Sequence, residues 1–153
     1  MHVLAWQSGY RGLLPDELLD GLEPAQRFER WTDIVATNAL PDRGTLVAVQ
    51  EGRVDGFVHL GPNRDEGLPE SVGEIWSFYV RPATWRGGVG RKLMAEALRN
   101  LSSAGFEAAT LWVLDGNDRA MSFYRACGFE PDGAVKADYR GGALRNLRYR
   151  RGL

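Results

Sequence analysis

Residues 80–98 read VRPATWRGGVGRKLMAEAL, and this stretch predicts the end of a strand, a glycine turn and the start of a helix. The strand is the aromatic and apolar run 75–80, and Pro82 marks the turn that follows it. After the turn, apolar residues recur at the spacing of one helical face, and Gly105 marks the end of the helix. The residues of that face are Val89, Leu93, Met94, Ala97, Leu98 and Leu101.

The glycine turn suits an anionic ligand. Glycines directly before a helix let a ligand approach the backbone, and the unpaired N–H groups of the first helical turn carry partial positive charge. Basic side chains flank the same turn. The stretch therefore predicts a site for phosphate or diphosphate, formed by Gly87, Gly88 and Gly90 with Arg86, Arg91 and Lys92.

The spacing of the glycines separates two common phosphate-binding turns. A P-loop is excluded, because Gly90 is followed by R-K-L where that pattern needs Lys and then Ser or Thr. A Rossmann turn needs G-x-G-x-x-G after a strand and an acid at the end of the next strand. Gly88 and Gly90 supply two glycines and Asp115 the acid, but Leu93 occupies the third glycine position. The Rossmann interpretation is weakened and stays open.

A second motif follows a buried strand at 110–114. Residues 117–129 read NDRAMSFYRACGF, which is N-x-x-A-x-x-F-Y-x-x-x-G-F. This resembles the second signature of the GNAT N-acetyltransferases, and residues 85–90, WRGGVG, resemble their [QR]-x-x-G-x-[GA] coenzyme A turn. Two motifs in this order are much more specific than either alone, and the resemblance extends from residues 6–13 to residues 148–151. Trp85 stands where the family has Gln or Arg, which leaves open which side chain helps to hold the diphosphate.

The residues and the resemblance together imply an α/β fold, the GNAT acyltransferase fold. We expect a mixed central sheet with antiparallel hairpins followed by one parallel βαβ crossover, and helices on both faces. The strands 45–50 and 54–60 form a hairpin, and a crossover joins 73–80 to 109–114. Residues 1–153 are expected to form one domain. The other expected elements are helices 2–7, 16–22, 25–37 and 118–126, and strands 134–137 and 144–150.

The N-terminus departs from the family pattern. The chain begins within a stretch that resembles the family's first helix, so either the start codon is assigned late or the strand that usually precedes this helix is absent. Loss of an edge strand exposes a row of backbone donors and acceptors, which a partner chain can cover. A homodimer is expected from the resemblance.

The resemblance implies that acetyl-CoA is the co-substrate. Its diphosphate is expected at the glycine turn, and its pantetheine arm along a strand that splays from its neighbour at Leu114. The freed backbone groups of that strand are expected to bind the pantetheine amides, and one N–H to face the developing oxyanion. The expected cofactor-binding residues are Phe78, Tyr79, Val80, Trp85, Arg86, Gly87, Gly88, Val89, Gly90, Arg91, Asn117 and Tyr124.

The implied reaction is direct attack of a primary amine on the thioester in a ternary complex, without an acyl-enzyme. Tyr124 is the expected acid, because a phenol with a pKa near 10 protonating a thiolate near 8.5 is uphill by only about 2 kcal/mol. Glu74, which opens the splayed strand, is the first choice for the base, and His59 is the second. Each residue also has a structural alternative: Tyr124 in the core, Glu74 as a solvated carboxylate, and His59 as a structural histidine near a strand end.

The sequence does not specify the acceptor beyond a small-molecule or peptide amine. Trp6, Tyr10 and Trp31 are candidates for its pocket, beside Asp16 and Glu17, although aromatic residues on amphipathic helices more often lie in the core. The alternative function is a coenzyme A binding or regulatory module that has kept the fold and lost the chemistry. The tail is locally basic, which indicates a solvated edge strand or, alternatively, a clamp on coenzyme A phosphate or on an acidic partner. Its basic residues are Arg140, Arg145, Arg148, Arg150 and Arg151.

Composition excludes several other classes. With 153 residues and a formal net charge of −1, the chain is not expected to bind nucleic acid. The single cysteine, Cys127, permits no internal disulfide and favours a reducing cytoplasm. One cysteine and two histidines cannot form a dedicated zinc site, so no metal is expected. The sequence shows neither a membrane-spanning apolar run nor a signal-peptide pattern, so no membrane partner is expected.

Overall fold

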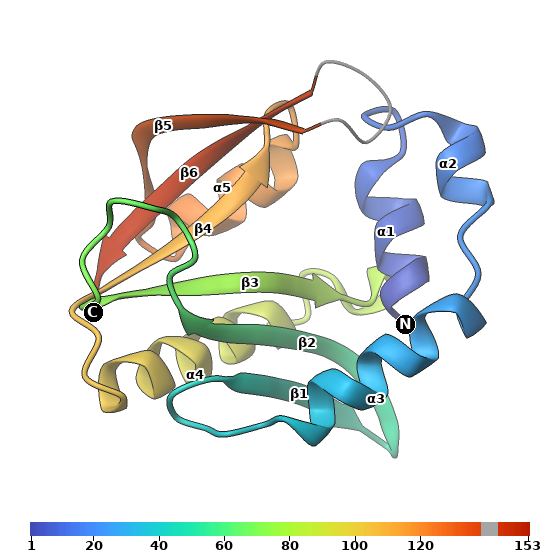
Figure 1. Ribbon diagram of the computed structural model, residues 1–153. Helices are drawn as coiled ribbons and strands as arrows, with labels where there is room; N and C mark the ends of the chain where they lie inside the picture. The colour runs from blue at the N-terminus through green and yellow to red at the C-terminus, as the bar shows by residue number, and fades with distance from the viewer. Residues whose placement is uncertain (139–143) are drawn as a thin grey trace.

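The computed structural model describes residues 1–138 and 144–153, which form a mixed α/β structure (Figure 1). The six strands are β1 (Gly44–Gln50), β2 (Arg53–Pro62), β3 (Val72–Val80), β4 (Ala108–Leu114), β5 (Glu130–Asp138) and β6 (Leu144–Gly152). The α-helices are α1 (His2–Tyr10), α2 (Asp16–Asp20), α3 (Phe28–Ala36), α4 (Val89–Ser103) and α5 (Asp118–Ala126). Two short 3₁₀ helices are η1 (Ala25–Arg27) and η2 (Pro82–Thr84).

The strands form one sheet in the order β1-β2-β3-β4-β6-β5. Only β3 and β4 pair in parallel among the described strands, and the other neighbours are antiparallel. α4 and α5 lie behind the sheet and α3 in front of it in the view of Figure 1. The predicted fold class is therefore confirmed, with one βαβ crossover through α4. In the part of the chain that the structure describes, no strand precedes β1.

Element boundaries differ from the expected ones mainly at the two ends of the chain. α1 continues to Tyr10, and the expected helix 25–37 is divided into η1 and α3. β5 begins before the expected strand 134–137. A register shift between Pro131 and Val135 interrupts the alternation of its side chains, so the sequence pattern misses its first residues. An interrupted alternation hides a strand from period-two analysis.

The predicted apolar face of α4 forms the main core. Five of its residues are buried, and Leu98 packs against them. They contact apolar side chains of β2, β3 and β4 and the aromatic residues of α5. This packing fixes the start of α4 directly beside the C-terminal end of β3. The buried residues of α4 are Val89, Leu93, Met94, Ala97 and Leu101.

β3 and β4 separate halfway along their length. They pair from Val72↔Ala108 to Ile75↔Leu111, and no pair follows, although β3 continues to Val80 and β4 to Leu114. Figure 1 shows the two strands diverging toward their C-terminal ends. The edge of β3 that faces β4 therefore lacks a strand partner over residues 76–80. Unpaired backbone groups of this kind need another partner.

A β-bulge in β3 lies at the same point. Leu60 of β2 pairs with Ile75 and His59 pairs with Ser77, so Trp76 is the extra residue. The bulge shifts the alternation of side chains, since Phe78 and Val80 pack against the same core as Ile75. Tyr79 consequently lies on the opposite face.

No helix in the described ranges is long and apolar enough to cross a bilayer.

Candidate active site

A cavity of about 740 Å³ occupies the gap between β3 and β4. Its walls come from α1, from the C-terminal halves of the two diverging strands, from the glycine turn and from α5. It thus reaches from the start of α4 to the face covered by α1. Ten of the predicted site residues line it: Phe78, Tyr79, Val80, Trp85, Arg86, Gly88, Gly90, Arg91, Asn117 and Tyr124.

Three residues of the predicted catalytic and cofactor-binding set do not line the cavity, and neither does Lys92 of the predicted phosphate site. Gly87 lies in the turn, where its N–H donates to the carbonyl oxygen of Thr84. Val89 is buried in the core below the turn. The third is Glu74, whose position is described below.

The glycine turn presents backbone donors to the cavity. Gly88 caps α4 in a left-handed conformation, with φ of 83°. The first bond of the helix joins the N–H of Lys92 to the carbonyl oxygen of Gly88. The N–H groups before Lys92 therefore have no partner within the helix, and they carry the positive end of its dipole. This arrangement is suited to an anion, as the sequence predicts.

Tyr124 lies on α5 beneath the gap and is 9% exposed. Its ring packs edge-on against Phe78 and Phe129. Burial raises the pKa of the Tyr124 phenol above its ordinary value, and the nearby Tyr10 adds to this effect. The hydroxyl group is therefore neutral and able to donate a hydrogen bond at any physiological pH.

Two more phenols line the same cavity from other elements. Tyr79 extends from β3, and Tyr10 from the last turn of α1. Burial raises the pKa of Tyr79 well above its ordinary value, and its interactions with Tyr10 add to the rise. Tyr124 also contributes to that rise, so the three hydroxyl groups lie within electrostatic reach of one another.

Asn117 has a structural partner. Its Oδ1 atom accepts a hydrogen bond from the N–H of Ala120 at 3.2 Å, which caps the N-terminus of α5. The residue also lines the cavity, so its expected contact with the pantetheine arm stays a prediction.

Glu74 lies in the part of β3 that pairs with both neighbours, opposite Gly61 and Thr110. It is 2% exposed. Its carboxylate accepts three hydrogen bonds from Arg64, whose donors are the backbone N–H at 3.0 Å, Nε at 3.2 Å and Nη2 at 2.6 Å. It is buried and paired rather than solvated, and it does not line the cavity. Its role as a base stays a prediction that this position does not favour.

His59 also lies away from the cavity lining. Its Nδ1 atom is 3.0 Å from the carbonyl oxygen of Gly44 and 2.8 Å from the hydroxyl of Thr45, and its ring packs against Trp76. Burial lowers its pKa. Among the described lining residues there is neither a carboxylate nor an imidazole.

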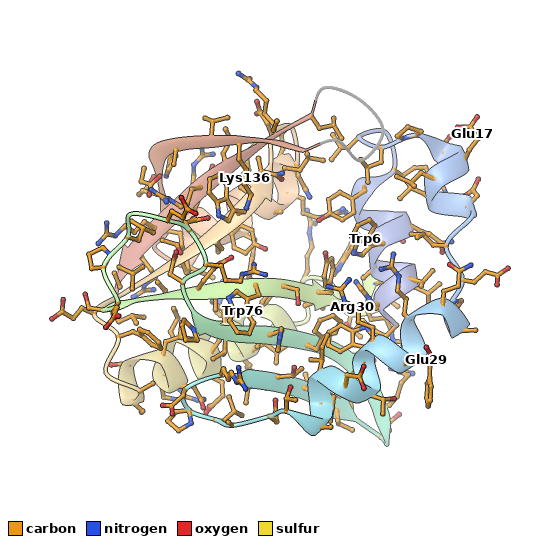
Figure 2. The ribbon with its side chains drawn as sticks, in the orientation of Figure 1. Trp6, Glu17, Glu29, Arg30, Trp76 and Lys136 are labelled. Carbon is orange, nitrogen blue, oxygen red and sulfur yellow. The ribbon has the colours of Figure 1, made fainter. Side chains whose placement is uncertain are left out.

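The candidates for the acceptor pocket separate into two groups. Tyr10 lines the cavity, and Trp6 packs on it with ring centroids 5.0 Å apart. Trp31 instead packs against Phe57 and donates its indole N–H to Nδ1 of His2 at 3.1 Å. The nearby acids do not face the cavity: Asp16 pairs with Arg11, and Glu17 points away from the molecule (Figure 2).

The described arginines of the tail have structural partners or lie apart from the cavity. Arg145 pairs at 2.6 Å with Asp115, the residue considered as a Rossmann acid. Arg148 pairs with Asp65 and Asp132. None of the tail arginines that the structure describes lines the cavity, and Arg140 falls outside the described residues. No group of acids, histidines and cysteines suited to a metal ion occurs in the described ranges.

Two residues at the cavity escaped the sequence analysis. Arg119 lies over the ring of Trp85, and Trp112 of β4 donates its indole N–H to Asp65 at 2.9 Å. Both line the cavity. The only available signal for Arg119 was its position two residues after Asn117.

Comparison with known proteins agrees with the motifs. The model of the acetyltransferase (GNAT) family matches residues 6–129. The uncharacterized N-acetyltransferase YuaI of Bacillus subtilis is 31% identical over 127 residues, which cover 82% of this chain and 69% of that protein. A mycothiol acetyltransferase of Saccharomonospora viridis is 40% identical over 114 residues, or 71% of this chain, and the match spans about a third (34%) of that protein.

A solved structure has the same fold. It is the PaiA N-acetyltransferase of Thermoplasma acidophilum in complex with coenzyme A, with a TM-score of 0.71 and 19% identity. The match covers 95% of this chain and 86% of that one.

Replacement of Glu74 tests its structural position. We expect Glu74→Gln to lower the free energy of unfolding by about 1–3 kcal/mol, because it removes a buried charge that accepts three hydrogen bonds from Arg64. Any reaction in the cavity should keep its wild-type pH dependence once rates are corrected for the folded fraction. Denaturant titration and pH–rate profiles measure the two effects.

The control is Glu70→Gln, which changes an exposed carboxylate near the same strand and should shift stability by less than about 0.5 kcal/mol. A Glu74→Gln protein with wild-type stability and an altered pH profile would contradict the structural assignment.

Proposed function

Because the chain belongs to the acetyltransferase (GNAT) family, we propose that it transfers an acetyl group from acetyl-CoA to a primary amine by direct attack in a ternary complex. One observation carries the proposal. The unpaired edge of β3 faces β4 across a cavity that leads from the N-terminus of α4 to three phenols. A strand edge next to a helix dipole offers donors for amides and for a diphosphate within one site.

The binding role falls to backbone groups. The N–H groups at the start of α4 bind the diphosphate, and the free edge of Phe78, Tyr79 and Val80 binds the pantetheine amides. Arg86 and Arg91 line the same end of the cavity and balance the phosphate charge. A backbone N–H of this edge stabilises the oxyanion of the tetrahedral intermediate.

Tyr124 serves the leaving group. Its buried, neutral phenol donates a hydrogen bond to the sulfur and gives up its proton as the thiolate departs. The raised pKa of the phenol makes this transfer unfavourable in isolation. The thiolate is desolvated in the same site, which raises its own pKa in the same direction.

The proton of the amine needs another route. No carboxylate or imidazole is among the described lining residues, and the carboxylate of Glu74 forms a salt bridge with Arg64. We assign the route to the hydroxyl groups of Tyr79 and Tyr10 and to water. Each phenol accepts one proton and releases its own, so the amine nitrogen loses a proton to solvent without forming a buried ion.

The acceptor is proposed to enter from the side of α1. Tyr10, Tyr79 and Trp112 line that side, which favours an amine with an apolar or flat group beside the nitrogen. Small-molecule and peptide amines both satisfy this chemistry. We further propose that residues 1–153 act as one domain in the cytoplasm. We also propose a homodimer, which is supported by the exposed Val47 and Val49 on edge strand β1.

A second function is favoured by one observation. The lack of a carboxylate or imidazole in the described lining suits a coenzyme A binding module without turnover. Stabilisation by acetyl-CoA with no transfer to any amine of a broad panel would select this function.

Gly90→Ala tests the proposed binding of acetyl-CoA. Gly90 is helical, and an added Cβ would meet the ring of Phe123 at 3.4 Å, an ordinary contact. The free protein should therefore be as stable as wild type or more so, since Ala favours helix by up to about 1 kcal/mol over Gly. The methyl group blocks the backbone at the diphosphate, so the Kd for acetyl-CoA should rise at least about tenfold. Thermal shift and calorimetry measure both.

Gly152→Ala is the control, because its Cβ meets nothing within 4 Å and lies outside the cavity. NAD and ATP are tested alongside acetyl-CoA and should leave the wild-type melting temperature unchanged. Wild-type protein that millimolar acetyl-CoA does not stabilise, or a Gly90→Ala protein with wild-type affinity, would overturn the binding assignment.

Tyr124→Phe tests the acid. We expect kcat to fall by about 10² to 10⁴ while the KM for acetyl-CoA changes little, because only proton donation is lost. Since burial raises the pKa of this phenol, wild-type kcat should show no loss from its ionisation up to about pH 10. Steady-state rates from pH 6 to pH 10 check both expectations.

The matched control is Tyr149→Phe, which removes a buried hydroxyl that has no hydrogen-bond partner in the described structure and lies outside the cavity lining. Its rates should equal those of wild type. Full turnover of Tyr124→Phe at every pH would remove Tyr124 from the mechanism.

A further inference from the structure

Trp85 takes the place of the Gln or Arg of the family motif, and its indole is fixed in position. The indole N–H donates to the carbonyl oxygen of Val80 at 2.9 Å. The ring therefore lies beside the end of β3, between this strand and the glycine turn. Tryptophan offers no cation to a phosphate there, but its flat face is available for stacking.

The guanidinium group of Arg119 lies on that face. Its Cζ atom is 3.7 Å from the ring centroid of Trp85, which is a close cation–π contact. Its Nη2 atom also donates to the carbonyl oxygen of Ser8 on α1, at 3.3 Å. Two residues far apart in the sequence thus hold the Arg119 side chain at the cavity, which it lines.

Arg119 carries a charge that nothing neutralises in the described structure. Seven other described arginines pair with a carboxylate, whereas no described salt bridge includes Arg119. The residue is exposed, and contact with the cavity wall lowers the pKa of its guanidinium only through partial desolvation. An exposed cation without a counterion, at a cavity wall, is suited to an anionic ligand.

We propose that Arg119, positioned by Trp85 and Ser8, supplies the side-chain cation for the diphosphate of coenzyme A that residue 85 does not supply. This inference rests on the proposed function and names a binding residue for it. The planar guanidinium uses one nitrogen for Ser8 and keeps further N–H donors for phosphate oxygens. Trp85 is a positioning residue that acts through Arg119.

The same contacts connect the two sides of the site. Arg119 bonds to α1, which contributes Tyr10 on the acceptor side, and stacks on the residue beside the glycine turn. Binding of the diphosphate to Arg119 would therefore stabilise α1 where the acceptor enters.

Arg119→Ala is assayed with two thioesters, acetyl-CoA and S-acetylpantetheine, which lacks the diphosphate. We expect kcat/KM for acetyl-CoA to fall about tenfold to hundredfold, the range for a hydrogen bond to a charged group. The value for S-acetylpantetheine should not change. Competitive inhibition by inorganic diphosphate should weaken by a similar factor, which gives a reading that does not depend on the slower thioester.

Three further variants separate charge, stacking and fold. Arg119→Lys should recover only part of the loss, since an ammonium group neither stacks flat on Trp85 nor forms a fork of donors. Trp85→Leu should weaken acetyl-CoA selectively, and less than Arg119→Ala does. Arg99→Ala removes an exposed arginine that pairs with Glu96 on α4, and it should match wild type.

Two results would overturn the proposal. An Arg119→Ala protein with wild-type use of acetyl-CoA excludes the contact. Equal losses with both thioesters, and unchanged inhibition by diphosphate, assign Arg119 a purely structural role through Ser8. Failure of the proposed function looks different, because wild-type protein would then neither bind nor use acetyl-CoA.

Discussion

The site depends on the point at which β3 leaves β4. Pairing stops after Ile75↔Leu111, and the bulge at Trp76 falls on the next residue of β3. A bulge bends its strand and shifts the alternation of side chains. It therefore opens the gap and also assigns the faces of β3: Phe78 packs on the core beside Tyr124, while Tyr79 turns toward α1. One extra residue thus sets the cavity, its free strand edge and the direction of the Tyr79 phenol.

The charges of the molecule are divided in a consistent way. Carboxylates such as Asp55 and Glu74 are buried and paired with arginines, and they hold loops to the sheet. The described lining of the cavity instead contains arginines, phenols and backbone donors. A site of this composition binds an anion at one end and keeps the other end neutral, which suits a thioester carried on a diphosphate and an amine that must lose its proton.

Local features of the fold were predictable from the sequence. The buried face of α4 and the glycine turn before it depend on residues within a few positions of one another, and the sequence predicts both. The cap at Asn117 is equally local but was not predicted. Non-local features were not. The pairing of Glu74 with Arg64 depends on how a polar loop folds back over β3, so Glu74, predicted as the base with a solvated carboxylate as the alternative, is in fact buried and paired.

The stacking of Arg119 on Trp85 was not predictable either. The two residues are distant in the sequence and come together only when the whole βαβ crossover has folded. The bulge was also hidden, since an apolar and aromatic run such as 75–80 has no alternation from which an extra residue can be detected.

The most direct test of the central claim is amide hydrogen exchange along β3, measured by NMR with and without saturating acetyl-CoA. If the free edge of β3 binds the pantetheine arm, amides within 76–80 that do not bond to β2 should exchange fast in the free protein and become protected on binding. Amides within 72–75, already paired with β4, should change little. Unchanged exchange over 76–80 in the presence of bound acetyl-CoA, or full protection without it, would contradict the claim.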